Sequence, residues 1–129
     1  MKTSRGGIAR ITVREAVERT GCGGEDEAAC LVDASVLLDV RELDEWSRGH
    51  APVAVHLPLT ALSEGVPLPP KAQGRALVVV CRSGSRSQLA VELLAVGGVE
   101  AVDVIGGMRQ WLAAGLTVVD SQGLSGTVA

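Results

Sequence analysis

The apolar run RALVVVC at 75–81 constrains the fold of this 129-residue chain more than any other stretch. A strand with one side facing solvent alternates apolar and polar residues, whereas this run has no polar residue between Ala76 and Cys81. Such a strand is typical of a parallel sheet with helices on both faces, because both of its sides are then buried. We therefore expect an α/β fold with a parallel sheet flanked by helices on both faces.

The rest of the chain alternates expected strands and helices, which supports the same architecture. After an edge strand at Ile11, Thr12 and Glu15 have the spacing of a capping box for a first helix that Gly21 can end. The other expected strands lie at 35–40, 53–58 and 99–105, and short helices or turns at 42–47 and 60–66. Two helical faces are expected to pack on the sheet, namely Leu89, Ala90, Leu93, Leu94 and Val96 after the apolar run, and Met108, Trp111 and Leu112 near the C-terminus.

Composition and charge exclude several classes of protein. Apolar residues make up 47% of the chain with two Trp and no Tyr or Phe, so we expect an aliphatic core. The net charge of −3 does not favour binding to nucleic acid or to an anionic membrane surface. No apolar stretch approaches the roughly 20 residues of a membrane span, and the first residues lack the apolar segment of a secretory signal.

The three cysteines are Cys22, Cys30 and Cys81, an odd number without the spacing of a disulfide framework. This favours reduced thiols and a cytoplasmic location. The C-x7-C spacing of Cys22 and Cys30 is not typical of zinc sites, so we expect no metal there and interpret both as surface or small-core cysteines. We expect a single domain at 11–119, with a flexible leader at 1–10 and a mobile tail at 120–129.

Cys81 ends the apolar run and is followed by a short polar loop, CRSGSRS at 81–87, with a helix expected to begin at 85–87. In open parallel sheets, ligands bind at the carboxyl ends of the strands. The amides of the loop lack strand and helix partners and can converge on one point, where the helix N-terminus adds partial positive charge. A cysteine in such an anion-binding loop is favoured as the thiolate.

The side chains of this loop suit the same task. Arg82 and Arg86 can each donate two hydrogen bonds to a sulfonate or phosphate, and the residues between them are small enough for the backbone to curl around a ligand. The simpler alternative is a buried cysteine before an ordinary polar turn. The arginines, the small residues and the helix start together favour a nucleophilic cysteine. The residues expected to bind the substrate are Arg82, Ser83, Gly84, Ser85, Arg86 and Ser87.

Four stretches resemble the single-domain rhodaneses, a family of sulfurtransferases. These stretches are LLDVRELDEWSRGH at 37–50, VHLPL at 55–59, CRSGSRS at 81–87 and GGMRQWLAAGLTV at 106–118. They follow the order found in that family and cover most of residues 11–119. The resemblance implies a rhodanese-like fold, with a central, mostly parallel sheet of about five strands flanked by helices.

The resemblance also implies a reaction. Cys81, as the thiolate, would attack the outer sulfur of a donor such as thiosulfate, expel sulfite and keep the sulfur as a persulfide, which cyanide or a thiol would then remove. The loop amides would stabilise the persulfide, and Arg82 and Arg86 would orient the donor. The implied partners are a small-molecule sulfur donor and a thiol or cyanide acceptor, with no cofactor. The physiological donor and acceptor stay open.

Two alternatives use the same cysteine. Phosphatases and arsenate reductases that resemble this fold have a C-x5-R loop, whereas Cys81 and Arg86 form C-x4-R. The shorter loop suits a sulfur carried on the cysteine better than a tetrahedral phosphate. A relay that passes persulfide sulfur between protein partners would have the same sequence, and this alternative stays open.

Several residues outside the loop are expected to support the pocket. Asp39 and Arg41 end a strand at the same sheet edge, and we interpret them as part of an ion-pair network that braces the loop. Gly106 and Gly107 are expected to let a neighbouring loop approach closely. Two further polar residues, interpreted as hydrogen-bonded structural residues, are His50 and His56.

Overall fold

The computed structural model describes residues 9–21 and 35–128. Within these residues, one sheet of five strands has the order β1-β5-β4-β2-β3, and every neighbouring pair is parallel. The strands are β1 (Arg10–Ile11), β2 (Val36–Asp39), β3 (Val55–His56), β4 (Leu77–Val80) and β5 (Ala101–Val104). The helices are α1 (Val13–Thr20), α2 (Leu43–Arg48), α3 (Leu59–Ser63), α4 (Arg86–Val96) and α5 (Gly107–Ala113), with a 3-10 helix η2 (Pro70–Ala72). The expected α/β class is confirmed.

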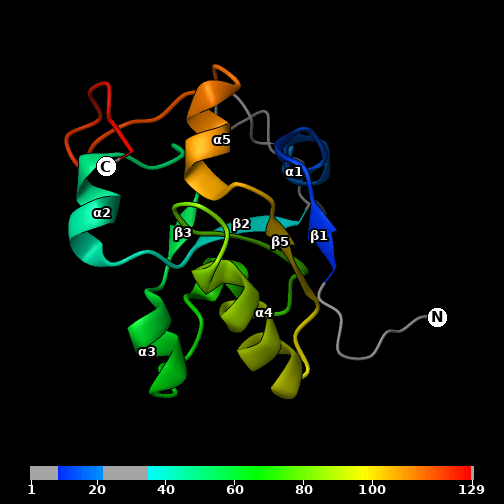
Figure 1. Cartoon of the computed structure of the whole chain (residues 1–129). Coiled ribbons are helices and arrows are strands. Elements are labelled where there is room, and N and C mark those ends of the chain that lie inside the picture. Colours follow the sequence, from blue (N-terminus) through cyan, green and yellow to red (C-terminus); the bar gives the residue numbers. More distant parts are fainter. Residues whose placement is uncertain (1–8, 22–34, 129) are drawn as a thin grey trace.

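The central strand β4 contributes to two cores, one on each face of the sheet. Val78 and Val80 pack in the core that includes residues of α1 and α5, whereas Leu77 and Val79 pack in the core that includes residues of α3 and α4. Figure 1 shows these two pairs of helices on opposite faces of the sheet. All four β4 side chains are buried, which explains the absence of polar residues from this run.

The predicted ends of α1 are confirmed. The amide of Glu15 donates to the hydroxyl of Thr12 at 3.1 Å, and the carboxylate of Glu15 accepts from the amide of Thr12 at 3.1 Å, so the capping box is complete. Gly21 ends the helix in the left-handed conformation, with φ of 65°. Val13 and Ala16 of this helix are buried in the core.

The expected inner faces of α4 and α5 are partly wrong. Leu89 and Val96 are 47% and 89% exposed, and Leu112 in α5 is 43% exposed. The sequence of α4 is apolar around most of its circumference, so the pattern did not single out the face that packs on the sheet. The buried residues of α4 are Ser87, Ala90, Val91 and Leu94.

The C-terminal segment folds back beside α2 (Figure 1). The amide of Thr127 donates to the carbonyl of Arg48 at 2.9 Å, and Val119 forms an antiparallel bridge with His50. At the other end, Arg10 belongs to β1, one residue before the expected domain start. The division into leader, domain and mobile tail stays a prediction, and Cys22 and Cys30 lie outside the described residues.

Because all strands are parallel, their carboxyl ends share one edge of the sheet, and the segments that follow β2, β4 and β5 leave the sheet there. The segment after β5 is hydrogen-bonded to the segment after β4 through Met108 and Cys81. The cysteine loop therefore lies at the edge that the sequence predicts. None of the helices in residues 9–21 and 35–128 is long and apolar enough to cross a membrane.

Candidate active site

Cys81 directly follows β4, and its side chain has no exposed surface. The amides of Gly84 and Ser87 donate to its sulfur at 3.1 and 3.3 Å. The thiol in turn donates to the hydroxyl of Ser87 at 3.4 Å. Two backbone amides thus converge on one sulfur, and they would stabilise negative charge on that atom.

Gly84 turns the loop inward, and its position requires a glycine. Its φ of 106° is a conformation that side chains rarely allow. A Cβ at this position would lie 3.0 Å from Nη2 of Arg10 and 3.2 Å from the amide nitrogen of Gly106. The backbone of the loop is therefore in close contact with both β1 and the segment after β5.

Gly107 allows the close approach of the neighbouring loop that the sequence predicts. With φ of 56°, it begins α5, and an added Cβ would overlap the carbonyl oxygen of Cys81. The next two amides hold the cysteine loop: Met108 donates to the carbonyl of Cys81 at 2.7 Å, and Arg109 donates to the carbonyl of Arg82 at 3.0 Å. The start of α5 thereby fixes the carbonyl groups of the first two residues of the loop.

Arg86, the first residue of α4, is paired with Glu45 of α2 through two hydrogen bonds of 2.6 and 2.8 Å. These hydrogen bonds lower the pKa of Glu45 to about 2 against the opposing effect of partial burial. The same pairing raises the pKa of Arg86. The guanidinium of Arg86 is thus held by a carboxylate, a contact that sequence reasoning missed.

The other expected substrate-binding residues differ in their surroundings. Arg82, Ser83 and Ser85 are exposed, and Arg82 forms no ion pair with any of the described residues. Ser87, in contrast, is fully buried, and its hydroxyl donates to Oδ2 of Asp103 at 2.9 Å. Of the two arginines in the loop, Arg86 is ion-paired, whereas Arg82 is exposed and has no ion pair among the described residues.

Asp39 and Arg41 form the expected internal ion pair. Both side chains are fully buried, and Nη2 of Arg41 lies 2.7 Å from Oδ2 of Asp39. The same nitrogen donates to the carbonyl of Gly49 at 2.6 Å, while Nη1 has no hydrogen-bond partner among the described residues. This pair connects the end of β2 to Gly49, the residue that ends α2. Helix α2 is also the helix that carries Glu45.

His50 and His56 are both hydrogen-bonded to the backbone, which agrees with this part of their interpretation from the sequence. Both rings stack on Trp46, with centroid distances of 3.6 and 4.6 Å. Nδ1 of His50 lies 2.8 Å from the carbonyl oxygen of Trp46, and Nε2 of His56 lies 2.7 Å from that of Arg41. These contacts support the backbone around α2.

Asp103 and Arg10 are two further residues near Cys81 that sequence reasoning missed. Asp103 of β5 is fully buried, and Arg10 of β1 is paired with it at 3.0 Å. The available signal was a lone aspartate within the apolar part of a predicted strand, since a buried carboxylate needs a partner. Nothing in the spacing identified that partner, because 93 residues separate the two.

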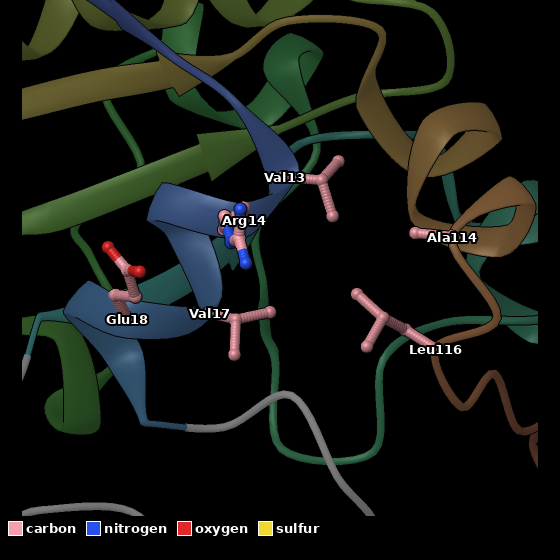
Figure 2. Close-up of a pocket in the computed structure, with 6 residues that line it drawn as sticks. All are labelled: Val13, Arg14, Val17, Glu18, Ala114 and Leu116. Atoms are coloured by element: carbon pink, nitrogen blue, oxygen red, sulfur yellow. The ribbon is translucent and has the colours of Figure 1, made fainter.

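A cavity of about 400 Å³ lies between α1 and the segment after α5, away from the cysteine loop. Figure 2 shows Val13, Val17 and Leu116 around this cavity, with the carboxylate of Glu18 directed away from it. None of the residues that line it belongs to the cysteine loop. Within residues 9–21 and 35–128, no three His, Cys, Asp or Glu side chains are grouped so that they could hold a metal ion.

The fold and the loop together define a class of α/β domain with a buried cysteine inside an amide-lined loop at the edge of a parallel sheet. The rhodanese-like domain family matches residues 25–114, more than half of the chain, and the chain belongs to this family. Its rhodanese domain is homologous to those of proteins named as sulfurtransferases.

Individual relatives agree with this assignment. The adenylyltransferase and sulfurtransferase uba4 of Ogataea parapolymorpha is 40% identical over 81 residues, which are 60% of this chain and 20% of that protein. YtwF of Bacillus subtilis, whose name proposes a sulfurtransferase, is 37% identical over 75 residues, 58% of this chain and 71% of that protein. A rhodanese-related protein from Thermoplasma volcanium has a similar structure, with a TM-score of 0.68 and 27% identity over 87% of this chain and 98% of that one. The chain thus spans about a fifth of the first of these relatives.

Proposed function

We propose that this chain is a sulfurtransferase that carries a sulfane sulfur as a persulfide on Cys81. The observation that supports this function most directly is the convergence of the Gly84 and Ser87 amides on the cysteine sulfur, at 3.1 and 3.3 Å. Fixed donors of this kind stabilise negative charge without having to reorganise during a reaction. They suit both the thiolate that attacks and the persulfide that results.

The reaction that we propose has two steps. First, the Cys81 thiolate attacks the outer sulfur of thiosulfate or a related donor; a new S–S bond forms, the S–S bond of the donor breaks, and sulfite leaves with the electron pair. Second, a thiolate or cyanide attacks the outer sulfur of the persulfide, and Cys81 departs as the thiolate. Sulfite is a good leaving group, so the first step needs no general acid.

The two arginines of the loop have different roles in this proposal. Arg82 is exposed next to Cys81, and we assign it the sulfonate of the donor, because its guanidinium has no ion pair among the described residues. Arg86 is already bound at both oxygens of Glu45, and we assign it the bracing of the loop against α2. This division refines the expectation that both arginines orient the donor.

Intact mass spectrometry after incubation with thiosulfate, without an acceptor, tests the proposal. The mass is expected to rise by one sulfur atom, the adduct to map to the peptide that contains Cys81, and dithiothreitol to remove it. Cys81→Ser should abolish the adduct, whereas the control variants Cys22→Ser and Cys30→Ser should retain it. An adduct on Cys22 or Cys30, or hydrolysis of an aryl phosphate without any sulfur transfer, would overturn the proposal.

A persulfide relay between proteins is the second candidate. It is favoured by the similarity to a longer relative that is named as both an adenylyltransferase and a sulfurtransferase, of which this chain covers 20%. The relay predicts that the Cys81 persulfide transfers its sulfur to a protein thiol faster than to cyanide or glutathione. Comparable rates with small thiols and protein thiols would instead favour the small-molecule enzyme.

A further inference from the structure

A buried carboxylate lies directly behind the cysteine loop. The thiol of Cys81 donates to the hydroxyl of Ser87 at 3.4 Å, and that hydroxyl donates to Oδ2 of Asp103 at 2.9 Å. Both Ser87 and Asp103 are fully buried. The carboxylate is therefore two hydrogen bonds away from the sulfur, in a region that water does not reach.

Arg10 binds this carboxylate and the loop at the same time. Its Nε donates to Oδ1 of Asp103 at 3.0 Å and its Nη2 to Oδ2 at 3.2 Å. The same Nη2 donates to the carbonyl of Gly84 at 3.1 Å. Gly84 is the residue whose amide donates to the cysteine sulfur. Arg10 lies on β1, outside the range 25–114 that matches the family.

An unpaired carboxylate at this position would oppose ionisation of the thiol, because like charges in a buried region repel each other strongly. At an effective dielectric constant of about 20 and a separation set by two hydrogen bonds of 3.4 and 2.9 Å, the carboxylate would lower the thiolate population on the order of 100-fold, and screening by solvent reduces this to about 10- to 100-fold. The paired guanidinium of Arg10 cancels this effect. The bond from Arg10 to Gly84 adds a second effect, since it fixes the peptide region that presents an amide to the sulfur.

The other charged groups around the loop are either paired or, like Arg109 at the start of α5, exposed to solvent. Arg86 of α4 is paired with Glu45 of α2, and Asp39 of β2 is paired with Arg41. Arg82 is exposed to solvent, which screens its charge. Asp103, on β5, is paired with Arg10 of β1. Without Arg10, the carboxylate of Asp103 would place a net negative charge near Cys81.

We propose that Arg10 is a positioning residue for Cys81, which neutralises Asp103 and holds Gly84 so that Cys81 reacts as the thiolate. This role of Arg10 rests on the proposed function in one respect, since it takes the Cys81 thiolate as the reacting group. Its test therefore uses the chemical reactivity of Cys81, which needs neither a sulfur donor nor an acceptor.

The experiment measures the rate of alkylation of Cys81 by iodoacetamide as a function of pH, followed at the Cys81 peptide by mass spectrometry in the full chain. Arg10→Ala is expected to move the midpoint of the profile up by about one to two pH units. Asp103→Asn alone should leave the midpoint unchanged or move it down. The double variant Arg10→Ala/Asp103→Asn should return it to within about half a unit of the unmodified protein, because the uncompensated charge is gone.

Two further comparisons separate charge from structural support. Arg10→Lys, which keeps the charge, should stay near the unmodified midpoint, whereas Arg10→Gln, which keeps a hydrogen-bond donor without the charge, should shift as Arg10→Ala does. Arg14→Ala, which removes an exposed arginine of α1, is the matched control and should have no effect. Thermal unfolding of each variant confirms that the folded protein is being measured.

An unchanged profile in Arg10→Ala and Arg10→Gln would overturn the proposal. The proposal would also be overturned if the midpoint of the double variant were no closer to that of the unmodified protein than the midpoint of Arg10→Ala is. A merely structural arginine would give that result. These outcomes are independent of the proposed sulfur transfer: a chain that forms no persulfide with thiosulfate but shows the expected midpoints refutes the proposed function and leaves the role of Arg10 intact.

Discussion

Replacing Glu45 with Gln should destabilise the fold at neutral pH and have much less effect in acid. Both carboxylate oxygens of Glu45 accept hydrogen bonds from Arg86, at 2.6 and 2.8 Å, which connects α2 to the start of α4. These bonds lower the pKa of Glu45 from 4.5 to about 2, although partial burial opposes the shift. The substitution removes the charge and leaves a side chain of nearly the same shape.

The sign of the pH dependence follows from the direction of the shift. The folded protein binds a proton at Glu45 less readily than the unfolded chain, so the pair contributes stability above about pH 4.5 and loses it as the pH falls through about 2. Taken in full, the shift corresponds to about 3 kcal/mol. The side chain of Arg86 is 32% exposed, so screening by water reduces the expected contribution to roughly 1–2 kcal/mol.

Urea unfolding of the unmodified protein and Glu45→Gln, from pH 7 down to pH 3, measures this contribution. The difference in the free energy of unfolding should be constant above about pH 5 and fall to less than half by about pH 3. Glu92→Gln removes an exposed carboxylate of α4 and serves as the control, with an expected change within about 0.5 kcal/mol. A difference of zero at pH 7, or an equally large one at pH 3, would refute the reasoning.

Two other substitutions test the loop itself. Gly107→Ala should destabilise the fold and slow persulfide formation, because the added Cβ would overlap the carbonyl oxygen of Cys81. Gly115→Ala is the control, since Gly115 has a positive φ of 81° but open space around it. Equal losses of stability for the two variants in urea unfolding would contradict the argument from the contact with Cys81. Arg82→Ala should lower kcat/KM for thiosulfate by roughly 10- to 150-fold, the value of a charge-assisted hydrogen bond, while transfer from the persulfide to cyanide changes little. Stopped-flow measurement of the two half-reactions checks this, and equal slowing of both would place donor recognition elsewhere.

The parts of the fold that the sequence predicted are those whose physical cause is local. The unbroken apolar run at β4 predicted burial on both faces, because no polar residue is available for a solvent-facing side. The capping box of Thr12 and Glu15 satisfies amides within one helical turn, so its spacing alone identified the start of α1. The converging amides of the cysteine loop follow similarly from the step between a buried strand and a helix start.

The parts that the sequence did not predict depend on partners that are distant in the chain. Arg86 was expected to bind the donor, but the fold brings Glu45 to it across 41 residues. Arg10 was given no role from the sequence, and the parallel pairing of β1 with β5 places it opposite Asp103. In each case the sequence around the charged residue does not identify its partner. The arrangement of the strands and helices in the fold determines which opposite charges meet.

The surroundings of Cys81 are therefore assembled from five elements besides β4, the strand that it follows. α4 supplies one of the two amides, α5 fixes the loop backbone, α2 holds Arg86, and β1 compensates the carboxylate that β5 places behind the sulfur. The range 25–114 that matches the family contains Cys81 and Asp103, but not Arg10. In this chain the charge balance at the cysteine consequently depends on a strand that precedes the matched range, and a segment cut to that range would retain the buried carboxylate without its guanidinium.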